Sequence, residues 1–212
     1  MERSTEHSDG VWPIPSGPPS HGDDKERTDE RGTPAAVGVS WAKPTSEQDE
    51  RWGIRRYHGR FATYPIADNN IAYVVLLAEE LHRMGTLNSV PFEWNHCLAT
   101  MRKVVASPVF FVRMAGNKDG FCGAVVGHVD QFFFSPKRMA TENAWYVREG
   151  TPFRAQIAMT LMREFIDWSM TDMGADHVQC GDIANINTMA VDALYRRIGF
   201  KRYGAIYKYG GA

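Results

Sequence analysis

The sequence predicts an α/β (α+β) domain in which a mixed sheet of six to seven strands is flanked by about four helices. Three observations support this fold class. Helical and strand-like apolar patterns alternate along residues 51–212, glycines follow the helical stretches, and a hydrophobic content of 43% can fill one core. The expected order of elements is β-α-α-β-β-β-α-β-α-β, without an internal repeat.

Six runs with strand-like patterns are expected to form strands. They cover residues 57–64, 109–113, 123–129, 144–147, 177–181 and 200–209. The second and third runs are joined by residues 116–120, whose two glycines and Asn-Lys-Asp core are typical of a hairpin turn. The last run is interpreted either as one bent strand or as a closing hairpin.

Four helices are expected from apolar residues at helical spacing. They cover residues 66–84, 92–105, 154–173 and 187–198. Asp68 is the expected N-cap of the first helix. Gly85, Gly174 and Gly199 are the expected ends of the first, third and fourth helices, because glycine readily adopts the left-handed conformation that ends a helix.

Residues 1–50 are predicted to form a long irregular tail that is disordered or docked on a partner. Six prolines, several glycines and serines, and the charged run 23–27 leave too little apolar surface for an independent core. Trp12 and Trp41 are either anchors for a protein partner or incidental. The expected division is therefore a tail over residues 1–50 and a folded domain over residues 51–212.

The composition argues against several classes of function. The chain has 24 Lys and Arg against 25 Asp and Glu, a net charge of −1, so no nucleic-acid partner is expected. No apolar run approaches about 18 residues, so neither a membrane span nor a secretory signal is expected. The three cysteines are widely spaced, which favours reduced thiols and a cytoplasmic protein. No Cys and His pair has a zinc spacing, so no metal is expected.

The segment from Val147 to Ala158 has the arrangement of an anion site. A strand, a tight loop and a helix N-terminus direct free backbone N–H groups and the helix dipole toward one point, where they can bind a phosphate. Any β-α unit offers these elements, so the pattern is not specific by itself. Arg154 is either a direct phosphate partner or an exposed residue of the first helical turn.

Two motifs near the C-terminus carry a family resemblance. Residues 187–190 are Asn-Thr-Met-Ala, and residues 194–200 are Leu-Tyr-Arg-Arg-Ile-Gly-Phe. Together with the order of elements, they resemble the Asn-x-x-Ala and Leu-Tyr-x-x-x-Gly-Phe pattern of the GCN5-related N-acetyltransferase (GNAT) superfamily. The resemblance covers about residues 57–209 and implies the GNAT fold, with acetyl-CoA as cosubstrate.

The resemblance also implies a binding site for the pyrophosphate of acetyl-CoA. In the family, a loop of the form Gln/Arg-x-x-Gly-x-Gly/Ala follows the fourth strand. The corresponding residues here are Val147 at the strand end, then Phe153, Arg154, Ala155, Gln156, Ile157 and Ala158. Ala158 matches the pattern, whereas Phe153 stands at the Gln/Arg position and Gln156 at the first glycine. If the motif is instead aligned one residue later, Arg154 occupies the Gln/Arg position. Ile157 and Met159 then occupy the Gly and Gly/Ala positions, where the motif requires small residues.

Catalytic roles follow from the same resemblance. In many members the tyrosine is the general acid toward the leaving thiolate, which implies this role for Tyr195; the alternative is a packed ring with a local hydrogen-bond acceptor. Asn187 is expected to contact the cosubstrate, although it lies one residue further from the tyrosine than usual. Glu142 is the candidate proton acceptor or a solvated carboxylate, whereas Glu149 would place its charge beside the phosphates.

The sequence therefore predicts an acetyl-CoA-dependent N-acetyltransferase acting on an unidentified amine. The alternative is a catalytically silent protein of the same fold. Residues 81–84, Leu-His-Arg-Met, followed by Val-Pro-Phe at 90–92, are similar to a segment of bacteriophage-encoded GNAT-like proteins. This second resemblance implies either an enzyme of the host cytoplasm or a virion component that docks through its N-terminal tail.

Overall fold

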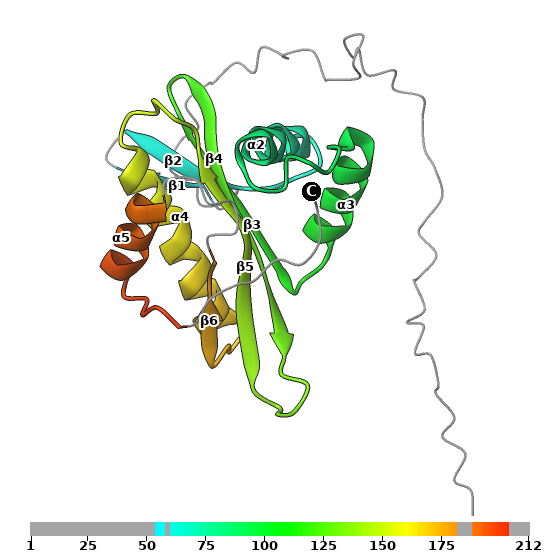
Figure 1. Cartoon of the computed structure of the whole chain (residues 1–212), viewed down its shortest axis with the longest axis vertical. Helices are drawn as coiled ribbons and strands as arrows, with labels where there is room; N and C mark the ends of the chain where they lie inside the picture. The colour runs from blue at the N-terminus through cyan, green and yellow to red at the C-terminus, as the bar shows by residue number, and fades with distance from the viewer. Residues whose placement is uncertain (1–53, 58–59, 182–187, 204–212) are drawn as a thin grey trace, which may run out of the picture. The chain divides into compact units, whose positions relative to one another are not determined.

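The structure is a computed structural model that describes residues 54–57, 60–181 and 188–203. These residues form a mixed six-stranded sheet in which the strands follow one another in chain order. Figure 1 shows the sheet between two helical layers, with α2 and α3 on one face and α4 and α5 on the other. The predicted α/β class, with helices flanking a mixed sheet, is confirmed.

The strands are longest in the middle of the sheet. They are β1 Arg55–Tyr57, β2 Phe61–Pro65, β3 Phe110–Asn117, β4 Gly120–Gln131, β5 Arg138–Val147 and β6 His177–Gln179. Pairing is antiparallel from β1 to β5, and β6 is parallel to β5. The single strand expected over residues 57–64 is wrong. The chain turns between β1 and β2, where Arg60 N donates a hydrogen bond to Tyr57 O at 3.0 Å.

The helices begin and end close to the expected positions. They are α2 Ile71–Met84, α3 Trp94–Ala106, α4 Arg154–Asp167 and α5 Thr188–Ile198, and a π-helical segment, Trp168–Asp172, continues α4. The expected N-cap Asp68 is wrong. Asn70 holds that position, and its Oδ1 accepts a hydrogen bond from Ala67 N at 2.8 Å, which keeps the preceding residues in a turn.

The C-terminal strand expected over residues 200–209 is wrong for the part that is described. Residues 200–203 have no regular structure, and residues 204–209 lie outside the described residues. Gly174 and Gly199 end their helices in the left-handed region, with φ of 61° and 113°, as predicted. Gly85 follows α2 with extended backbone, where its N–H caps the carbonyls of Leu81 and His82.

The apolar core has one part on each face of the sheet. Ile157, Leu161 and Phe165 of α4 are fully buried against one face, and the side chains of α2 are buried against the other. Gly127 of β4 lets the ring of Phe165 lie directly on the sheet, because a Cβ at Gly127 would be 2.4 Å from Phe165 Cε2. This close packing fixes the distance between α4 and the sheet.

A buried carboxylate joins α4 to the first three strands. Glu164 of α4 is 4% exposed, and its Oε1 accepts hydrogen bonds from Tyr57 Oη at 2.5 Å and Thr63 Oγ1 at 2.7 Å. Arg113 Nε donates to Glu164 Oε2 at 2.8 Å. Burial, together with the neighbouring carboxylate, raises the pKa of Tyr57 to about 12. These bonds hold α4, and therefore its N-terminus, in a fixed position on the sheet.

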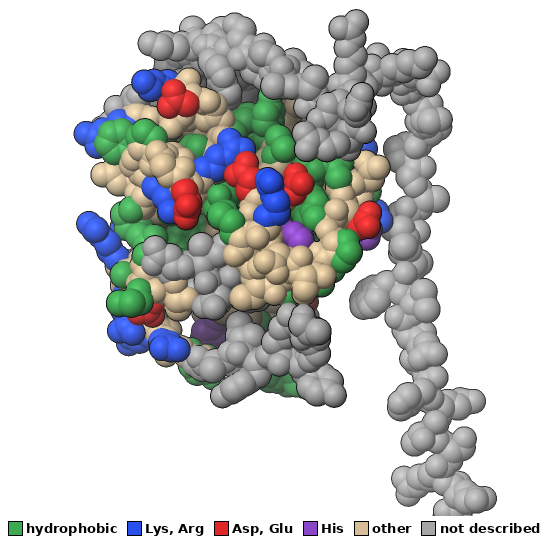
Figure 2. Space-filling view, turned by 45° about the horizontal axis from the view of Figure 1, so that its top comes forward, with side chains coloured by type: hydrophobic (Ala, Val, Ile, Leu, Met, Phe, Trp, Pro, Cys, Tyr) green, Lys and Arg blue, Asp and Glu red, His purple; other side chains and the backbone are tan. Residues whose placement is uncertain are grey.

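The surface in Figure 2 carries both signs of charge. Lys and Arg side chains are interspersed with Asp and Glu side chains over this face. No helix in the described part of the chain is long and apolar enough to cross a membrane. All three cysteines are free thiols.

Candidate active site

The gap between β5 and β6 creates the principal candidate site. The two strands pair only at Met139–His177, Ala140–Val178 and Thr141–Gln179, and β6 ends there. β5 continues to Val147, so the edge formed by residues 142–147 has no partner in β6. Among the described residues, β6 does not cover the backbone groups along this edge, and Arg154 Nε bonds the last carbonyl, Val147 O.

A cavity of about 510 Å³ lies along this edge of β5. It is lined by every residue of β5 from Glu142 to Val147, by Arg154, Ala155 and Ala158 of α4, and by residues of α5. Leu81 of α2 also lines it, which means that the cavity reaches around the strand edge toward the second face of the sheet. Its volume lies within the range of about 300 to 1,000 Å³ that is usual for small-molecule sites.

Tyr195 and Glu142 meet in this cavity. Tyr195 Oη donates a hydrogen bond to Glu142 Oε2 at 3.2 Å. The ring of Tyr195 packs against Trp145 and Phe200, with centroids 5.2 Å and 5.5 Å away. Glu142 lies within β5 rather than before the strand. The structure therefore brings together the two residues that were predicted to be catalytic, with the ring packed and the hydroxyl bonded to a carboxylate.

Cys180 lies beside the same carboxylate. Burial, and then the negative charge of Glu142, raise the pKa of the Cys180 thiol well above its usual range. Its Sγ contacts Met162 Sδ at 3.8 Å. A thiol kept protonated in this way is a poor nucleophile, and Cys180 packs against the core on the α4 face of the sheet.

The N-terminus of α4 also borders the cavity. Phe153, just before the helix, has the left-handed conformation with φ of 61°. Arg154 N donates to Thr151 O at 3.2 Å, and Ile157 N donates to Phe153 O at 3.0 Å. Between them, the N–H groups of Ala155 and Gln156 have no hydrogen-bond partner among the described residues. Two free amides at a helix N-terminus form the arrangement that binds phosphate.

Arg154 lies between these amides and β5. Its Nε donates to Val147 O at 2.9 Å, and its Nη1 is 4.0 Å from Glu149 Oε1. The side chain is 42% exposed and lines the cavity. Arg154 is therefore a cavity residue, fixed through one nitrogen to the end of the strand, rather than a freely exposed residue of the first turn.

The other predicted residues of the phosphate loop have different surroundings. Val147, 4% exposed, and Ala158, 7% exposed, line the cavity, and Ala158 O accepts a hydrogen bond from Trp145 Nε1 at 3.1 Å. The side chain of Ile157 is fully buried in the core. Phe153 is exposed and stacks under Arg60, whose Cζ lies 4.8 Å from the ring centroid. Asn187 lies outside the described residues.

An ion pair that the sequence did not indicate joins α2 to the residue that follows β5. Arg148 follows β5, and its Nε and Nη2 donate to the carboxylate of Glu80 on α2 at 2.7 to 3.0 Å. Arg148 Nη1 also donates to Phe121 O at 2.9 Å. The hydrogen bond to Glu80 raises the pKa of Arg148. No motif links a helix glutamate to an arginine that is distant in the sequence, so only the fold brings this pair together.

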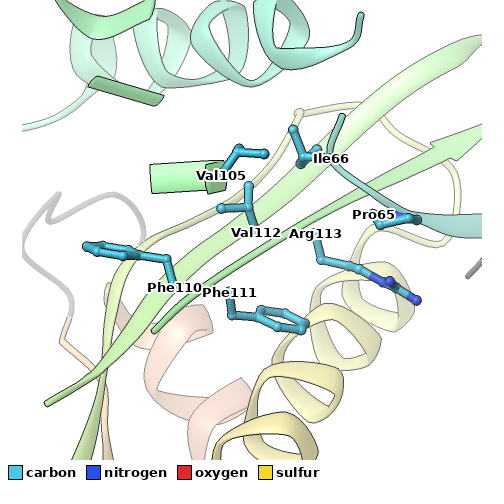
Figure 3. A pocket seen from close by; sticks show the side chains of 7 residues that line it. All are labelled: Pro65, Ile66, Val105, Phe110, Phe111, Val112 and Arg113. Carbon is cyan, nitrogen blue, oxygen red and sulfur yellow. The ribbon is translucent and has the colours of Figure 1, made fainter. Parts of the chain in front are cut away.

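A second hollow, of about 210 Å³, lies beyond the end of β2. Figure 3 shows Val112 of β3, Val105 of α3 and Ile66, which follows β2, approaching one another, while Arg113 points toward α4. Arg113 is the charged residue among the described lining residues, and it binds Glu164. This hollow therefore presents no available reactive group. Within the described ranges, no group of three or more His, Cys, Asp or Glu residues could hold a metal ion.

The described domain has the fold of the GCN5-related N-acetyltransferases. An aminoglycoside N-acetyltransferase in complex with CoA matches it with a TM-score of 0.57 and 13% identity, over 73% of this chain and 97% of that one. An aminoglycoside acetyltransferase from an uncultured soil metagenomic sample, in complex with sisomicin, matches with a TM-score of 0.53 and 18% identity, over 72% and 96%.

A third structure is the aminoglycoside 6'-N-acetyltransferase of Acinetobacter haemolyticus, with a TM-score of 0.56 and 12% identity, over 71% of this chain and 97% of that one. No protein-family model and no curated protein matches the sequence. At these identities the likeness defines the fold, and the activity has to be argued from the residues of the site.

Proposed function

We propose that the chain is an acetyl-CoA-dependent N-acetyltransferase that acts on a primary amine. The main support is the cavity along β5, which is lined by the Tyr195–Glu142 pair and by Ala155 at the N-terminus of α4, where the amides of Ala155 and Gln156 have no hydrogen-bond partner among the described residues. Acetyl-CoA has matching chemistry, because a long polar arm joins its anionic pyrophosphate to its reactive thioester. The site thus offers an anion-binding group and a proton-transferring group in one continuous space.

The pyrophosphate is assigned to the N-terminus of α4. The N–H groups of Ala155 and Gln156 would donate to its oxygens, and the helix dipole would favour the negative charge. The guanidinium of Arg154 would add a charge-assisted hydrogen bond from a nitrogen that is not bonded to Val147 O. Gln156 does not obstruct this role in principle, since its side chain is exposed and a helical N–H points along the axis.

The arm between phosphate and thioester is assigned to the open edge of β5. Backbone groups of residues 142–147 are left without a β6 partner and can bond the amides of the arm. Trp145, Leu194 and Ala190 provide apolar lining. This assignment places the thioester near Tyr195 and Glu142 when the phosphates are at α4.

Tyr195 and Glu142 are assigned the proton transfers. Acetyl-CoA supplies the activated acyl group, whose carbonyl carbon the amine attacks. Glu142 accepts a proton from the attacking nitrogen, the carbon–sulfur bond breaks, and Tyr195 donates its hydroxyl proton to the departing sulfur. Because Tyr195 Oη and Glu142 Oε2 are 3.2 Å apart, the proton on Glu142 can then return to the tyrosine. A second proton from the substrate ammonium goes to solvent, which completes the balance.

The experiment is a thiol-release assay with acetyl-CoA and several nucleophiles, including sisomicin, a simple alkylamine and hydroxylamine. Hydroxylamine is small and largely unprotonated at neutral pH, so it does not require a specific acceptor pocket. Because hydroxylamine also cleaves thioesters unaided, each rate is compared with that of a protein-free sample. We expect release of CoA above that rate and an acetylated product in the mass spectrum. Tyr195→Phe should lower kcat by about 100-fold or more, whereas Tyr203→Phe, at a fully exposed tyrosine, should not change it. A rate of release that does not exceed the protein-free rate with any nucleophile would contradict the proposal.

A further inference from the structure

A β-bulge in β5 lies within the cavity lining. Gly127 of β4 pairs with Glu142, and Val126 pairs with Ala144, so Asn143 is the extra residue between them. Its Oδ1 lies 2.7 Å from His128 Nδ1. A carboxamide oxygen can only accept a hydrogen bond, so Nδ1 of His128 carries the proton in this pair.

Glu142 and Asn143, at the bulge, contact residues on opposite faces of the sheet. Glu142 faces the α4 and α5 layer, because its partner Gly127 lies under Phe165 and its carboxylate bonds Tyr195. His128 is the next residue along β4 and therefore faces the opposite layer. Asn143 reaches His128 and still lines the cavity. The carboxylate of Glu142 and the carboxamide of Asn143 thus lie at adjacent positions of β5, and both residues line the cavity.

The contact with His128 determines which hydrogen-bonding group of Asn143 can bind a ligand. Its oxygen is occupied, and its Nδ2 has no hydrogen-bond partner among the described residues. Asn143 is also exposed at the cavity, so nothing described prevents a ligand from reaching the NH₂ group. The side chain is therefore a hydrogen-bond donor whose orientation is held by another residue.

We propose that Asn143 donates a hydrogen bond to the carbonyl oxygen of the acyl group in bound acetyl-CoA, with His128 as its positioning residue. This inference rests on the proposed function, which places the thioester beside Glu142. Asn143 is the neighbouring residue in the chain and lines the same cavity. The acyl oxygen gains negative charge when the amine attacks, and a donor that is already oriented stabilises that charge without further reorganisation.

The test compares the dissociation constants of acetyl-CoA and CoA by calorimetry, which requires no acceptor amine. CoA lacks the acyl oxygen, so the ratio of the two constants isolates the contact. We expect the full-length protein to bind acetyl-CoA roughly two- to tenfold more tightly than CoA, which is the effect of one hydrogen bond. Asn143→Ala should abolish this preference and leave the CoA constant unchanged. Asn95→Ala, at an exposed asparagine of α3, should preserve the preference.

Two further variants separate the hydrogen bond from a packing effect. Asn143→Asp keeps an oxygen for His128 but replaces the donor with a second oxygen, so it should weaken acetyl-CoA more than CoA. His128→Phe should reduce the preference in part, because Asn143 then loses its fixed orientation. An unchanged preference in Asn143→Ala, or an equal loss for both ligands, would overturn the inference while leaving the proposed function intact. Failure of the unmodified protein to bind either ligand would overturn both.

Discussion

The hydroxyl of Tyr195 lies 3.2 Å from a carboxylate oxygen of Glu142, although 53 positions separate the two residues in the chain. One residue comes from α5 and the other from β5, and both line the same cavity. A proton donor and a proton acceptor in direct contact can exchange a proton within one catalytic cycle. We therefore expect Tyr195 and Glu142 to act as a unit.

Kinetic non-additivity tests this unit. Tyr195→Phe and Glu142→Gln should each lower kcat by about 100-fold or more, because each removes a proton-transfer group. The double variant should be no slower than the slower single variant, since either change already disables the pair. Thiol release with hydroxylamine and with an alkylamine provides the measurement. Multiplicative losses in the double variant would show that the two residues act separately.

Arg154 should contribute to affinity for the phosphates and not for the acyl arm. Replacing it in Arg154→Ala removes a charge-assisted hydrogen bond of about 1.5 to 3 kcal/mol, so acetyl-CoA should bind roughly ten- to a hundredfold more weakly. Binding of S-acetylpantetheine, which lacks the pyrophosphate, should change little. Arg163→Ala, at an exposed arginine on the same helix, is the control. An equal loss for both ligands would instead indicate that Arg154 supports the cavity through Val147.

Introducing a glycine at position 156, where the GNAT pattern has one, should not tighten the binding of acetyl-CoA. The N–H of Gln156 has no hydrogen-bond partner in the described part of the chain, and the left-handed backbone lies at Gly150 and Phe153 rather than at Gln156. Gln156→Gly should therefore leave the acetyl-CoA dissociation constant within about twofold and lower the free energy of unfolding by up to about 1 kcal/mol. Titration calorimetry and urea unfolding measure the two effects. A tenfold gain in affinity would show that the glutamine side chain blocks the site.

The buried Glu164 should be essential for the stability of the domain. Glu164→Ala leaves Arg113 without its carboxylate and removes the acceptor of two hydroxyl hydrogen bonds. Loss of one partner of a buried ion pair typically costs about 3 to 5 kcal/mol, which should be visible in urea unfolding. Asp167→Ala, at an exposed position of α4, should change the free energy of unfolding by less than about 0.5 kcal/mol. Comparable effects of the two variants would contradict the role of the cluster.

The helices and the central hairpin were predictable because their signals are local. Apolar spacing located α2 to α5 in the sequence, and the glycines around Asn117 located the turn between β3 and β4. The turn between β1 and β2 was missed because a short strand pair is defined by cross-strand pairing, which the sequence pattern of one segment does not show. The bulge at Asn143 could not be predicted either, because it depends on the register of β5 with Val126 and Gly127 of β4.

The sequence indicated candidate residues that line the cavity, but not the contacts between their side chains. Family resemblance indicated Tyr195 and the start of α4, and general chemistry indicated Glu142. Tyr195 bonds Glu142 because α5 packs beside β5. The spacing of residues in the sequence does not predict this packing. The GNAT pattern has a glycine at the position of Gln156, whereas the non-glycine residue with a left-handed backbone is Phe153. Local propensity cannot locate such a position when tertiary contacts impose it.

Binding of acetyl-CoA is the most direct test of the central claim that the cavity along β5 is an acyl-CoA site. The measurement is the melting temperature of the full chain with and without millimolar acetyl-CoA. At a ligand concentration one hundred times the dissociation constant, binding should stabilise the folded state by about 2.7 kcal/mol, which corresponds to a shift of roughly 5 °C or more. An unchanged melting temperature at millimolar acetyl-CoA would contradict the claim and favour a catalytically silent protein of the same fold.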